Sequence, residues 1–367
     1  MKKIGVIGRG FVGSAVEFGF SAQCGCNAII KSYDIDESRK KDSLEDTVNN
    51  SDFIFVSVPT PSNKSGIDLS FLNSALASIE NINKSNNIIL IRSTIVPGTT
   101  RKLAEKFKRL NIVFNPEFLT ERNAKFDFIN QSRFIIGGEK SLTDKVANLY
   151  KWRFGNTAPV IQTDFETAEL IKYMNNCFFA TKVSFLNEMK LISDKINADW
   201  DTSIQGFVSD GRIGHSHVQV PGPDGKFGFG GNCFPKDVKA IIEYSNKLGL
   251  NLNTIEGAWK TNLSVRPKED LKDLECIESR RKRKVKTGIM GKLMSRTVDD
   301  DCKERIIDHT LNDYQEKCVD YMKENDGLLV CHATGLGKTL TAIAASQCFL
   351  DDNNKVRDTG KIIYAHM

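Results

Sequence analysis

The sequence lacks the features of a membrane protein or a secreted protein. It has no apolar run long enough to span a membrane and no signal peptide, and its nine cysteines show no paired spacing that would bind metal. The closest pair of cysteines is Cys24-Gly25-Cys26. These absences exclude a membrane-spanning class and a disulfide framework. We expect reduced thiols, a cytoplasmic location and no metal site.

A strong charge of one sign is also absent. The net charge of +5 is mild and does not by itself indicate nucleic-acid binding. Hydrophobic residues make up 40% and charged residues 26% of the sequence, which are ordinary values for a globular protein. A chain of 367 residues is long enough for two or three domains with a substantial core, so the composition fits a soluble enzyme.

A glycine fingerprint follows the first apolar stretch. Residues 2–7 are typical of a short buried strand, and a helical pattern begins directly after Gly13. In such a fingerprint the first glycine makes a tight turn, the second admits a pyrophosphate, and the third lets helix and strand pack closely. The free N–H groups and the dipole of the helix then favour the anion. The residues predicted to bind this part of a dinucleotide are Gly8, Gly10, Phe11, Val12 and Gly13.

An acid ends the second predicted strand. Residues 28–33 lead into Asp34, about 20 residues beyond Gly13, where a ribose-binding carboxylate is expected. This acid favours NAD over NADP, because a 2′-phosphate would meet a carboxylate. Arg39 would cover the adenine face or, as the alternative, accept such a phosphate. The alternative interpretation is a glycine-rich turn in an unrelated α/β domain. The preceding strand, the spacing and the acid together argue against it.

Three further apolar runs predict strands of a parallel sheet. Residues 53–58, 88–92 and 112–114 are typical of strands buried on both faces. Polar residues follow each run, at the sheet edge where open α/β folds bind their ligands. These segments are Pro59-Thr60-Pro61-Ser62, Ser93-Thr94, and Asn115-Pro116-Glu117. We expect an NAD-binding Rossmann-type domain over residues 1–163.

A cysteine follows a glycine-rich loop further along the chain. The segment Gly225–Asp237 contains Cys233, with Lys236 and Asp237 close behind it. Glycines let backbone approach a ligand, and a cysteine beside a cation is biased towards the thiolate that attacks carbonyl carbon. A buried structural cysteine would need neither feature. The pattern predicts that Cys233 is a catalytic nucleophile.

A long helix is predicted between these two regions. Asp164 can cap a helix that runs to about Ile196, and a further helix is expected from about 254 to 263. Lys172 and Asn176 are four residues apart, so they share one face of the long helix. From these residues alone, a capped polar patch and a functional site remain equal alternatives. We expect a mainly helical central domain over residues 164–274.

The composition changes after residue 274. Residues 275–312 contain the basic run 279–286, which we interpret as a solvated linker in preference to a nucleic-acid contact. In residues 313–367 a strand, a glycine turn and a helix predict a phosphate-binding loop, and this segment resembles the start of a DEAD-like helicase. Its ATP-binding residues would be Gly335, Gly337, Lys338 and Thr339. No acidic strand that would hold magnesium follows, so we expect a partial segment, and nucleic-acid binding only through residues 275–367.

Residues 1 to about 274 resemble the UDP-glucose/GDP-mannose dehydrogenases, most closely the UDP-glucose 6-dehydrogenase branch. The ordered set of matching motifs is specific. It comprises the glycine fingerprint with 33–39, then 58–61, 92–99, 115–121, 169–172 with Asn176, 187–188, 210–214 and the Cys233 loop. The resemblance implies oxidation of a sugar C6 alcohol to a carboxylate with two NAD molecules per turnover, and precursors of surface polysaccharides as products.

The resemblance also implies a role for each matching residue. Cys233 would be the nucleophile, Lys172 would stabilise oxyanion charge and Asn176 would donate a hydrogen bond to the same oxygen. Asp237 would act with Lys172 and an ordered water as the base system, and Glu121 would serve the hydrolysis step. Other residues would bind cofactor or substrate: Pro59, Thr60 and Thr94 for the cofactor, Glu117 and Thr94 for substrate and water, and Phe118, Leu119, Phe227, Gly228 and Gly230 for the substrate.

Arg212 resembles a residue that reaches a substrate in a neighbouring subunit, which implies a homodimer. Two departures from the family pattern stand out. Arg122-Asn123 replace the usual Gly-Ser pair, and no third, nucleotide-sugar-binding domain is recognisable after residue 274. Two alternative functions therefore remain: a nucleic-acid-dependent ATPase fragment and an idle NAD-binding protein. The substrate stays open among UDP-glucose, UDP-N-acetylhexosamines and GDP-mannose.

Overall fold

The computed structural model describes residues 1–63, 66–156, 158–267 and 269. All of these residues belong to one compact unit, Met1–Thr287. Within them, no helix is both long enough and apolar enough to cross a membrane, and no cluster of His, Cys, Asp and Glu has the arrangement of a metal site. The predicted linker and the helicase-like segment with its phosphate loop lie outside the described residues.

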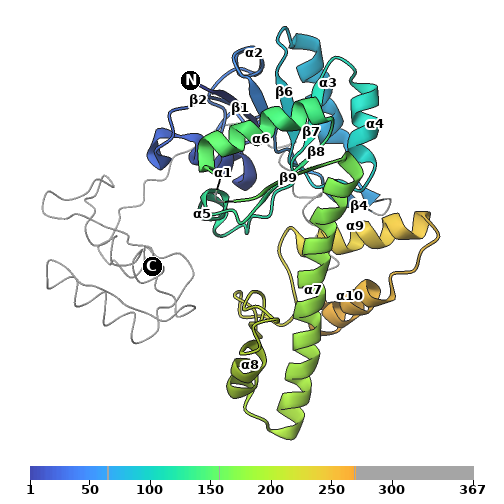
Figure 1. The fold of residues 1–367 in the computed structure, drawn as a ribbon. Helices are drawn as coiled ribbons and strands as arrows, with labels where there is room; N and C mark the ends of the chain where they lie inside the picture. The colour runs from blue at the N-terminus through green and yellow to red at the C-terminus, as the bar shows by residue number, and fades with distance from the viewer. Residues whose placement is uncertain (64–65, 157, 268, 270–367) are drawn as a thin grey trace, which may run out of the picture. The chain divides into compact units, whose positions relative to one another are not determined.

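A seven-stranded sheet forms the N-terminal part, with strand order β2-β1-β3-β6-β7-β8-β9 (Figure 1). Strands β2, β1, β3, β6 and β7 run parallel, β7 pairs with β8 antiparallel, and β8 and β9 are again parallel. The strands are β1 (Lys3–Ile7), β2 (Ile29–Tyr33), β3 (Phe53–Val56), β6 (Ile88–Ile91), β7 (Asn111–Phe114), β8 (Phe134–Gly137) and β9 (Val160–Thr163). The predicted apolar strands are thus confirmed, with ends shifted by one or two residues.

Helices cover both faces of this sheet. One apolar cluster packs a sheet face against α1, α5 and α6, and a second packs the other face against α2, α3, α4 and the start of α7. This two-sided burial explains the uninterrupted apolar strands β3 and β6. The covering helices are α1 (Phe11–Phe20), α2 (Leu44–Asn49), α3 (Ser70–Ile82), α4 (Thr99–Lys106), α5 (Ala124–Ile129) and α6 (Lys140–Phe154), with a short 3-10 turn η1 (Ala22–Cys24) and a hairpin of β4 (Ser62–Asn63) and β5 (Gly66–Ile67).

The long helix α7 (Phe165–Ile196) leaves the end of β9 and extends away from the sheet (Figure 1). Asp164 caps it by accepting a hydrogen bond of 2.8 Å from the backbone N–H of Thr167, so the predicted helix and its cap are confirmed. Helices α9 (Phe234–Lys247) and α10 (Asn253–Val265) pack along α7 in a third apolar cluster, and α8 (Trp200–Val208) follows α7 in the chain. The Rossmann-type domain with a helical central part confirms the expected fold class.

The turn between β1 and α1 depends on glycine at two positions. Gly8 has φ of +88°, a left-handed conformation that favours glycine. A Cβ atom at Gly13 would lie 1.9 Å from the carbonyl oxygen of Gly8, whereas a Cβ atom at Gly10 would meet nothing within 4 Å. Gly13 therefore serves close helix–strand packing, and Gly10 leaves open space at the start of α1.

This difference gives a stability prediction. Gly13→Ala is expected to lower the free energy of unfolding by about 2 kcal/mol, because the new Cβ overlaps the backbone at Gly8. Gly10→Ala is the matched control: its Cβ meets nothing within 4 Å, so it should cost at most about 1 kcal/mol, through the poorer N-cap residue alone. Urea titration followed by circular dichroism measures both. Equal losses in the two variants would contradict the packing role of Gly13.

Candidate active site

The Cys233 loop is held by buried amides from two helices. Asn187 on α7 accepts a hydrogen bond of 2.9 Å from the backbone N–H of Gly228. Asn262 on α10 accepts from the N–H of Phe229 at 2.7 Å and donates to its carbonyl at 3.0 Å. A Cβ atom at Gly228 would lie 2.3 Å from the Asn262 side-chain oxygen, so this position needs glycine. These contacts fix the backbone conformation of the loop that leads to Cys233, the N-cap residue of α9.

Arg266, at the end of α10, also holds the Cys233 loop in place. Its guanidinium pairs with Asp224 at 2.5 Å and Glu269 at 2.8 Å, and donates to the carbonyl of Phe227 at 3.3 Å. A Cβ atom at Gly230 would lie 2.3 Å from Arg266 Nη2. Sequence reasoning missed Asn262 and Arg266 as parts of the site. Their signal was a polar pair four residues apart at the end of a helix that otherwise packs on the core.

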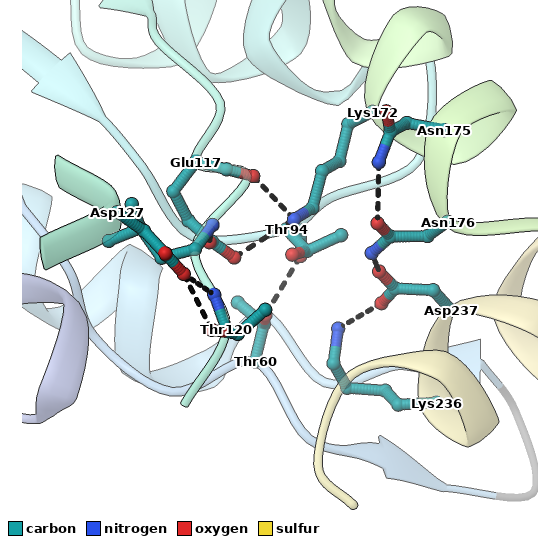
Figure 2. Close-up of polar contacts among 11 residues, drawn as sticks. Thr60, Thr94, Glu117, Thr120, Asp127, Lys172, Asn175, Asn176, Lys236 and Asp237 are labelled. Carbon is teal, nitrogen blue, oxygen red and sulfur yellow. Dashed lines mark hydrogen bonds and ion pairs between the residues drawn. The ribbon is translucent and has the colours of Figure 1, made fainter. Parts of the chain in front are cut away.

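Figure 2 shows two largely buried charge pairs, Lys172 with Glu117 and Lys236 with Asp237, and all four of these groups act electrostatically on Cys233. Lys172 Nζ lies 2.9 Å from Glu117 Oε1, and both side chains are at most 5% exposed. Asp237 Oδ2 accepts a hydrogen bond of 2.6 Å from Asn176 Nδ2, and Asp237 Oδ1 lies 2.5 Å from Lys236 Nζ. The structure thus brings Lys172, Asn176 and Asp237 together, which favours the site interpretation of the α7 polar face over a capped patch.

The expected thiolate bias of Cys233 is wrong in this conformation. Burial raises the pKa of the Cys233 thiol to about 11, and Glu117 and Asp237 add to the increase while Lys172 and Lys236 oppose it. Each lysine is paired with a carboxylate, so no unbalanced positive charge faces the sulfur. Burial lowers the pKa of Lys172, but Glu117 and Asp237 outweigh it and the net shift is upward, so Lys172 is a cation. Cys233 therefore needs a base when it attacks.

The loop after β7 delivers three of the predicted substrate residues. Glu117 Oε2 accepts a hydrogen bond of 2.8 Å from the backbone N–H of Leu119, and Asp127 accepts from both Thr120 groups, the N–H at 2.7 Å and the hydroxyl at 2.5 Å. Lys172 Nζ lies 5.5 Å from the ring centre of Phe118. This network fixes the loop above the sheet, with Glu117 and Leu119 buried.

Glu121 lies at the exposed end of that loop. Its Oε2 accepts a hydrogen bond of 2.8 Å from the side-chain amide of Asn232, the residue before Cys233. Its neighbour Arg122 donates to the carbonyl of Pro223 at 3.0 Å. The unusual Arg122 therefore joins this loop to the segment that precedes Cys233.

Threonines at the ends of β3 and β6 face each other. The Thr60 hydroxyl donates to the carbonyl of Thr94 at 2.8 Å, and both residues are buried (Figure 2). Pro59, one residue earlier, is exposed. The bond joins the two strand ends at the edge of the sheet where the polar segments were predicted to lie.

Arg212 is not brought to Cys233 within this chain. It pairs with Asp210 at 2.5 Å, and its side chain is 89% exposed. Contact with a site in a second copy of the chain stays a prediction.

The residues predicted to bind a dinucleotide lie at the β1–α1 turn and after β2. The N-cap residue of α1 is Gly10, and no side chain among the described residues accepts a capping hydrogen bond at this helix end. An anion can therefore approach the N–H groups of the first turn. Asp34 follows β2 and accepts hydrogen bonds from the backbone N–H groups of Arg9 at 2.5 Å and Asp36 at 2.9 Å. Phe11 and Val12 pack on the core behind this turn. Arg39 is exposed, with its guanidinium 3.5 Å from Asp36.

Glu169 ties α7 to the start of α4. Its carboxylate is fully buried and accepts hydrogen bonds from the backbone N–H groups of Gly98 and Thr100 and from the Thr100 hydroxyl, at 2.6 to 2.7 Å. The N-cap residue of α4, Gly98, has no side chain that could accept a hydrogen bond from the first turn. The Glu169 carboxylate on α7 accepts these hydrogen bonds instead. Burial raises the pKa of Glu169 to about 7, against the lowering effect of these hydrogen bonds.

Comparison with known proteins matches two domains of one family. Residues 35–153 match the NAD binding domain of the UDP-glucose/GDP-mannose dehydrogenase family, and residues 166–264 match its central domain. The chain is 38% identical over 222 residues to UDP-glucose 6-dehydrogenase of Rickettsia bellii, covering 59% of this chain and 50% of that protein. It is 32% identical over 298 residues to UDP-glucose 6-dehydrogenase TuaD of Bacillus subtilis, covering 71% and 63%. The chain thus spans half to two thirds of these relatives' length.

Solved structures show the same fold. A UDP-glucose dehydrogenase from Pyrobaculum islandicum superposes with a TM-score of 0.63 at 27% identity, covering 71% of this chain and 68% of that one. A UDP-D-ManNAc dehydrogenase from Pyrococcus horikoshii superposes with a TM-score of 0.61 at 22% identity, covering 76% and 72%. The second likeness concerns the fold alone.

The raised pKa of Cys233 predicts its reactivity. Alkylation of Cys233 by iodoacetamide should rise about tenfold per pH unit between about pH 7.5 and 9.5 without a plateau, because the thiolate is a minor species throughout. Glu117→Gln removes a charge that raises this pKa and should accelerate the reaction at fixed pH. Peptide mass spectrometry separates Cys233 from Cys24, the control thiol, whose rate should not respond to Glu117→Gln. A plateau at or below about pH 8 would show a thiolate instead.

Glu169 predicts a pH-dependent stability. Its pKa rises from an ordinary 4.5 to about 7 on folding, so its contribution to stability is full below about pH 4.5 and is lost as the pH rises through 7. The unfolding free energy of the wild type relative to Glu169→Gln should therefore fall between these values, by up to about 1.4 kcal/mol per pH unit. Urea titrations across that range measure the difference.

Glu166→Gln is the control for this experiment. The Glu166 carboxylate is partly exposed and accepts hydrogen bonds from Arg101 at 2.6 and 2.7 Å, which lower its pKa. Glu166 therefore contributes to the free energy of unfolding above about pH 4.5 and loses this contribution as the pH falls, so its pH dependence is opposite in sign to that of Glu169. Parallel pH profiles for the two variants would refute the assignment to Glu169.

Proposed function

Because this chain belongs to the UDP-glucose/GDP-mannose dehydrogenase family, of which it carries the NAD-binding and central domains, we propose that it is a nucleotide-sugar 6-dehydrogenase that oxidises UDP-glucose to UDP-glucuronate. NAD is the cofactor of its N-terminal domain. The observation that carries the proposal is the grouping of Lys172, Asn176 and Asp237 around the Cys233 loop. An idle NAD-binding protein has no use for this set.

In the first oxidation the C6 hydroxyl loses a proton and a hydride. When NAD is bound, its nicotinamide accepts the hydride. Lys172 donates two N–H groups to Glu117, to the backbone oxygen and to Oε1, so its third N–H remains for the developing alkoxide. Asn176 has one amide N–H on Asp237 and a second for the same oxygen. The proton leaves through an ordered water to Asp237.

In the second oxidation the aldehyde carbon is captured by Cys233. A carbon–sulfur bond forms, the thiol proton passes to the base system, and the carbonyl oxygen takes up a proton to give a thiohemiacetal. Since the pKa of the thiol is about 11, deprotonation accompanies the attack. Loss of a second hydride, to a second NAD when it is bound, and of the hydroxyl proton, to the base system, gives a thioester. Covalent capture keeps the aldehyde from leaving between the two steps.

Water then hydrolyses the thioester. Glu121 takes a proton from the water as its oxygen bonds to the acyl carbon, the carbon–sulfur bond breaks and Cys233 regains its proton. The product is a carboxylate, and the sum of the steps uses two NAD per sugar. Glu117 and Thr94 hold substrate and water, and the backbone of Gly228 and Gly230 contacts the sugar.

UDP-glucose is the proposed substrate because UDP-glucose 6-dehydrogenases are among the relatives above 30% identity. UDP-D-ManNAc and GDP-mannose are the competing substrates, since proteins named for them share the fold or the family. They differ from UDP-glucose in groups on the sugar ring or in the nucleotide.

A homodimer is part of this proposal. Apolar side chains that are 44 to 68% exposed follow one another along α7 at intervals of four and seven residues, which keeps them on one helix face. They are Leu170, Met174, Phe178, Phe185, Ile192 and Ile196. A second copy covering this face would bring Arg212, exposed here, within reach of the partner's substrate.

The experiment that tests the function is NADH formation at 340 nm by the purified chain with UDP-glucose, UDP-N-acetylhexosamines and GDP-mannose. We expect two NADH per UDP-glucose. Cys233→Ser should bind NAD as the wild type does and fail to complete the second oxidation, because serine forms no thioester.

Full acid production by Cys233→Ser would refute the thioester route. NAD binding without turnover on any sugar would instead support the idle NAD-binding alternative. Light scattering on the same preparation tests the dimer.

A further inference from the structure

Three carboxylates lie around the Cys233 loop, and they differ in how their oxygens are occupied. Glu117 uses Oε1 for Lys172 and Oε2 for the N–H of Leu119. Asp237 uses Oδ1 for Lys236 and Oδ2 for Asn176. Glu121 uses Oε2 for the amide of Asn232, and within the described part of the chain its Oε1 has no partner.

This difference separates the carboxylates by what they can do. A base that takes a proton from water needs a lone pair directed at that water. Glu117 and Asp237 are buried and already accept a donor at each oxygen, so a water reaches only their remaining lone pairs; at Asp237 the first oxidation uses such a water. Glu121 is exposed, and within the described residues its Oε1 accepts no hydrogen bond and no lysine or arginine forms an ion pair with it.

The carboxylate of Glu121 is held from one side only. Asp127 fixes the backbone of the loop around Glu121 through Thr120. The Glu121 side chain itself is exposed, so without a further contact it would sample several rotamers. The amide of Asn232 selects one of them through a hydrogen bond of 2.8 Å. Asn232 directly precedes Cys233, so this bond ties the carboxylate to the backbone that carries the sulfur.

We propose that Asn232 is a positioning residue for thioester hydrolysis: its amide holds Glu121 so that Oε1 faces the acyl carbon bonded to Cys233. This inference rests on the proposed function. In the step concerned, water oxygen bonds to the acyl carbon, one water proton moves to Glu121 Oε1, the carbon–sulfur bond breaks and the sulfur is reprotonated. Asn232 exchanges no proton and forms no bond to the substrate.

The neighbouring contact provides a matched control. Arg122 donates to the carbonyl of Pro223, so it joins the same two loops without touching the Glu121 carboxylate. Arg122→Ala therefore removes loop restraint alone, whereas Asn232→Ala removes the bond to Glu121. Asn232→Asp places a like charge against Glu121 and should have the larger effect.

The test uses the full chain with NAD and UDP-glucose, by stopped-flow at 340 nm and rapid quench with intact mass spectrometry. For Asn232→Ala we expect an unchanged NADH burst, a steady-state rate about tenfold lower, and accumulation of chain carrying the acyl group on Cys233. A structural defect would slow the burst as well. Arg122→Ala should show no acyl accumulation.

Each other result overturns the inference. A burst slowed as much as the steady state, with no acylated chain, assigns Asn232 to general loop structure. Equal accumulation in Arg122→Ala assigns the effect to loop restraint. Normal turnover by Asn232→Ala overturns the inference and leaves the proposed function standing, whereas no NADH from the wild-type chain with any sugar removes both.

Discussion

The ion pair between Lys172 and Glu117 is the interaction on which the site depends. It joins α7 to the loop after β7, across the boundary between sheet and helices, with both side chains almost fully buried. A buried charge left without its partner is costly, so neither residue can move away alone. The remaining polar groups are arranged around this fixed point: Asn176 one turn further along α7, and Asp237 on α9 bonded to it.

Charge neutrality follows from this arrangement and determines the chemistry of the thiol. Each lysine near Cys233 has its own carboxylate, so burial controls the sulfur and raises its pKa. A thiol kept protonated is protected from unwanted alkylation and oxidation while no substrate is bound. Its reactivity then depends on the proton acceptors around it, which makes the hydrogen-bond network as important as the nucleophile.

Much of the fold could be predicted from the sequence because its signals are local. Apolar runs identified β3 and β6, and Asp164 identified the start of α7. Residues such as Lys172 and Cys233 were predictable as a set only through the family pattern, since 61 residues separate them. Asn262 and Arg266 stand out in sequence as a polar pair four residues apart, but which loop they hold could not be predicted, because their side chains occupy the Cβ positions of Gly228 and Gly230 only in three dimensions. The thiolate expectation failed for a similar reason: sequence placed Lys236 beside Cys233 but did not show Asp237 neutralising it.

The packing of Asn262 and Arg266 against the Cys233 loop restricts which substitutions such chains can accept during evolution. Side-chain atoms of Asn262 and Arg266 occupy the volume that a Cβ atom would need at Gly228 and Gly230. A larger residue at either glycine therefore requires a compensating loss at the end of α10, although the two segments are more than thirty residues apart in sequence. Positions 228 and 262, and positions 230 and 266, should accordingly vary as coupled pairs among homologues, with each glycine retained wherever its polar partner is retained.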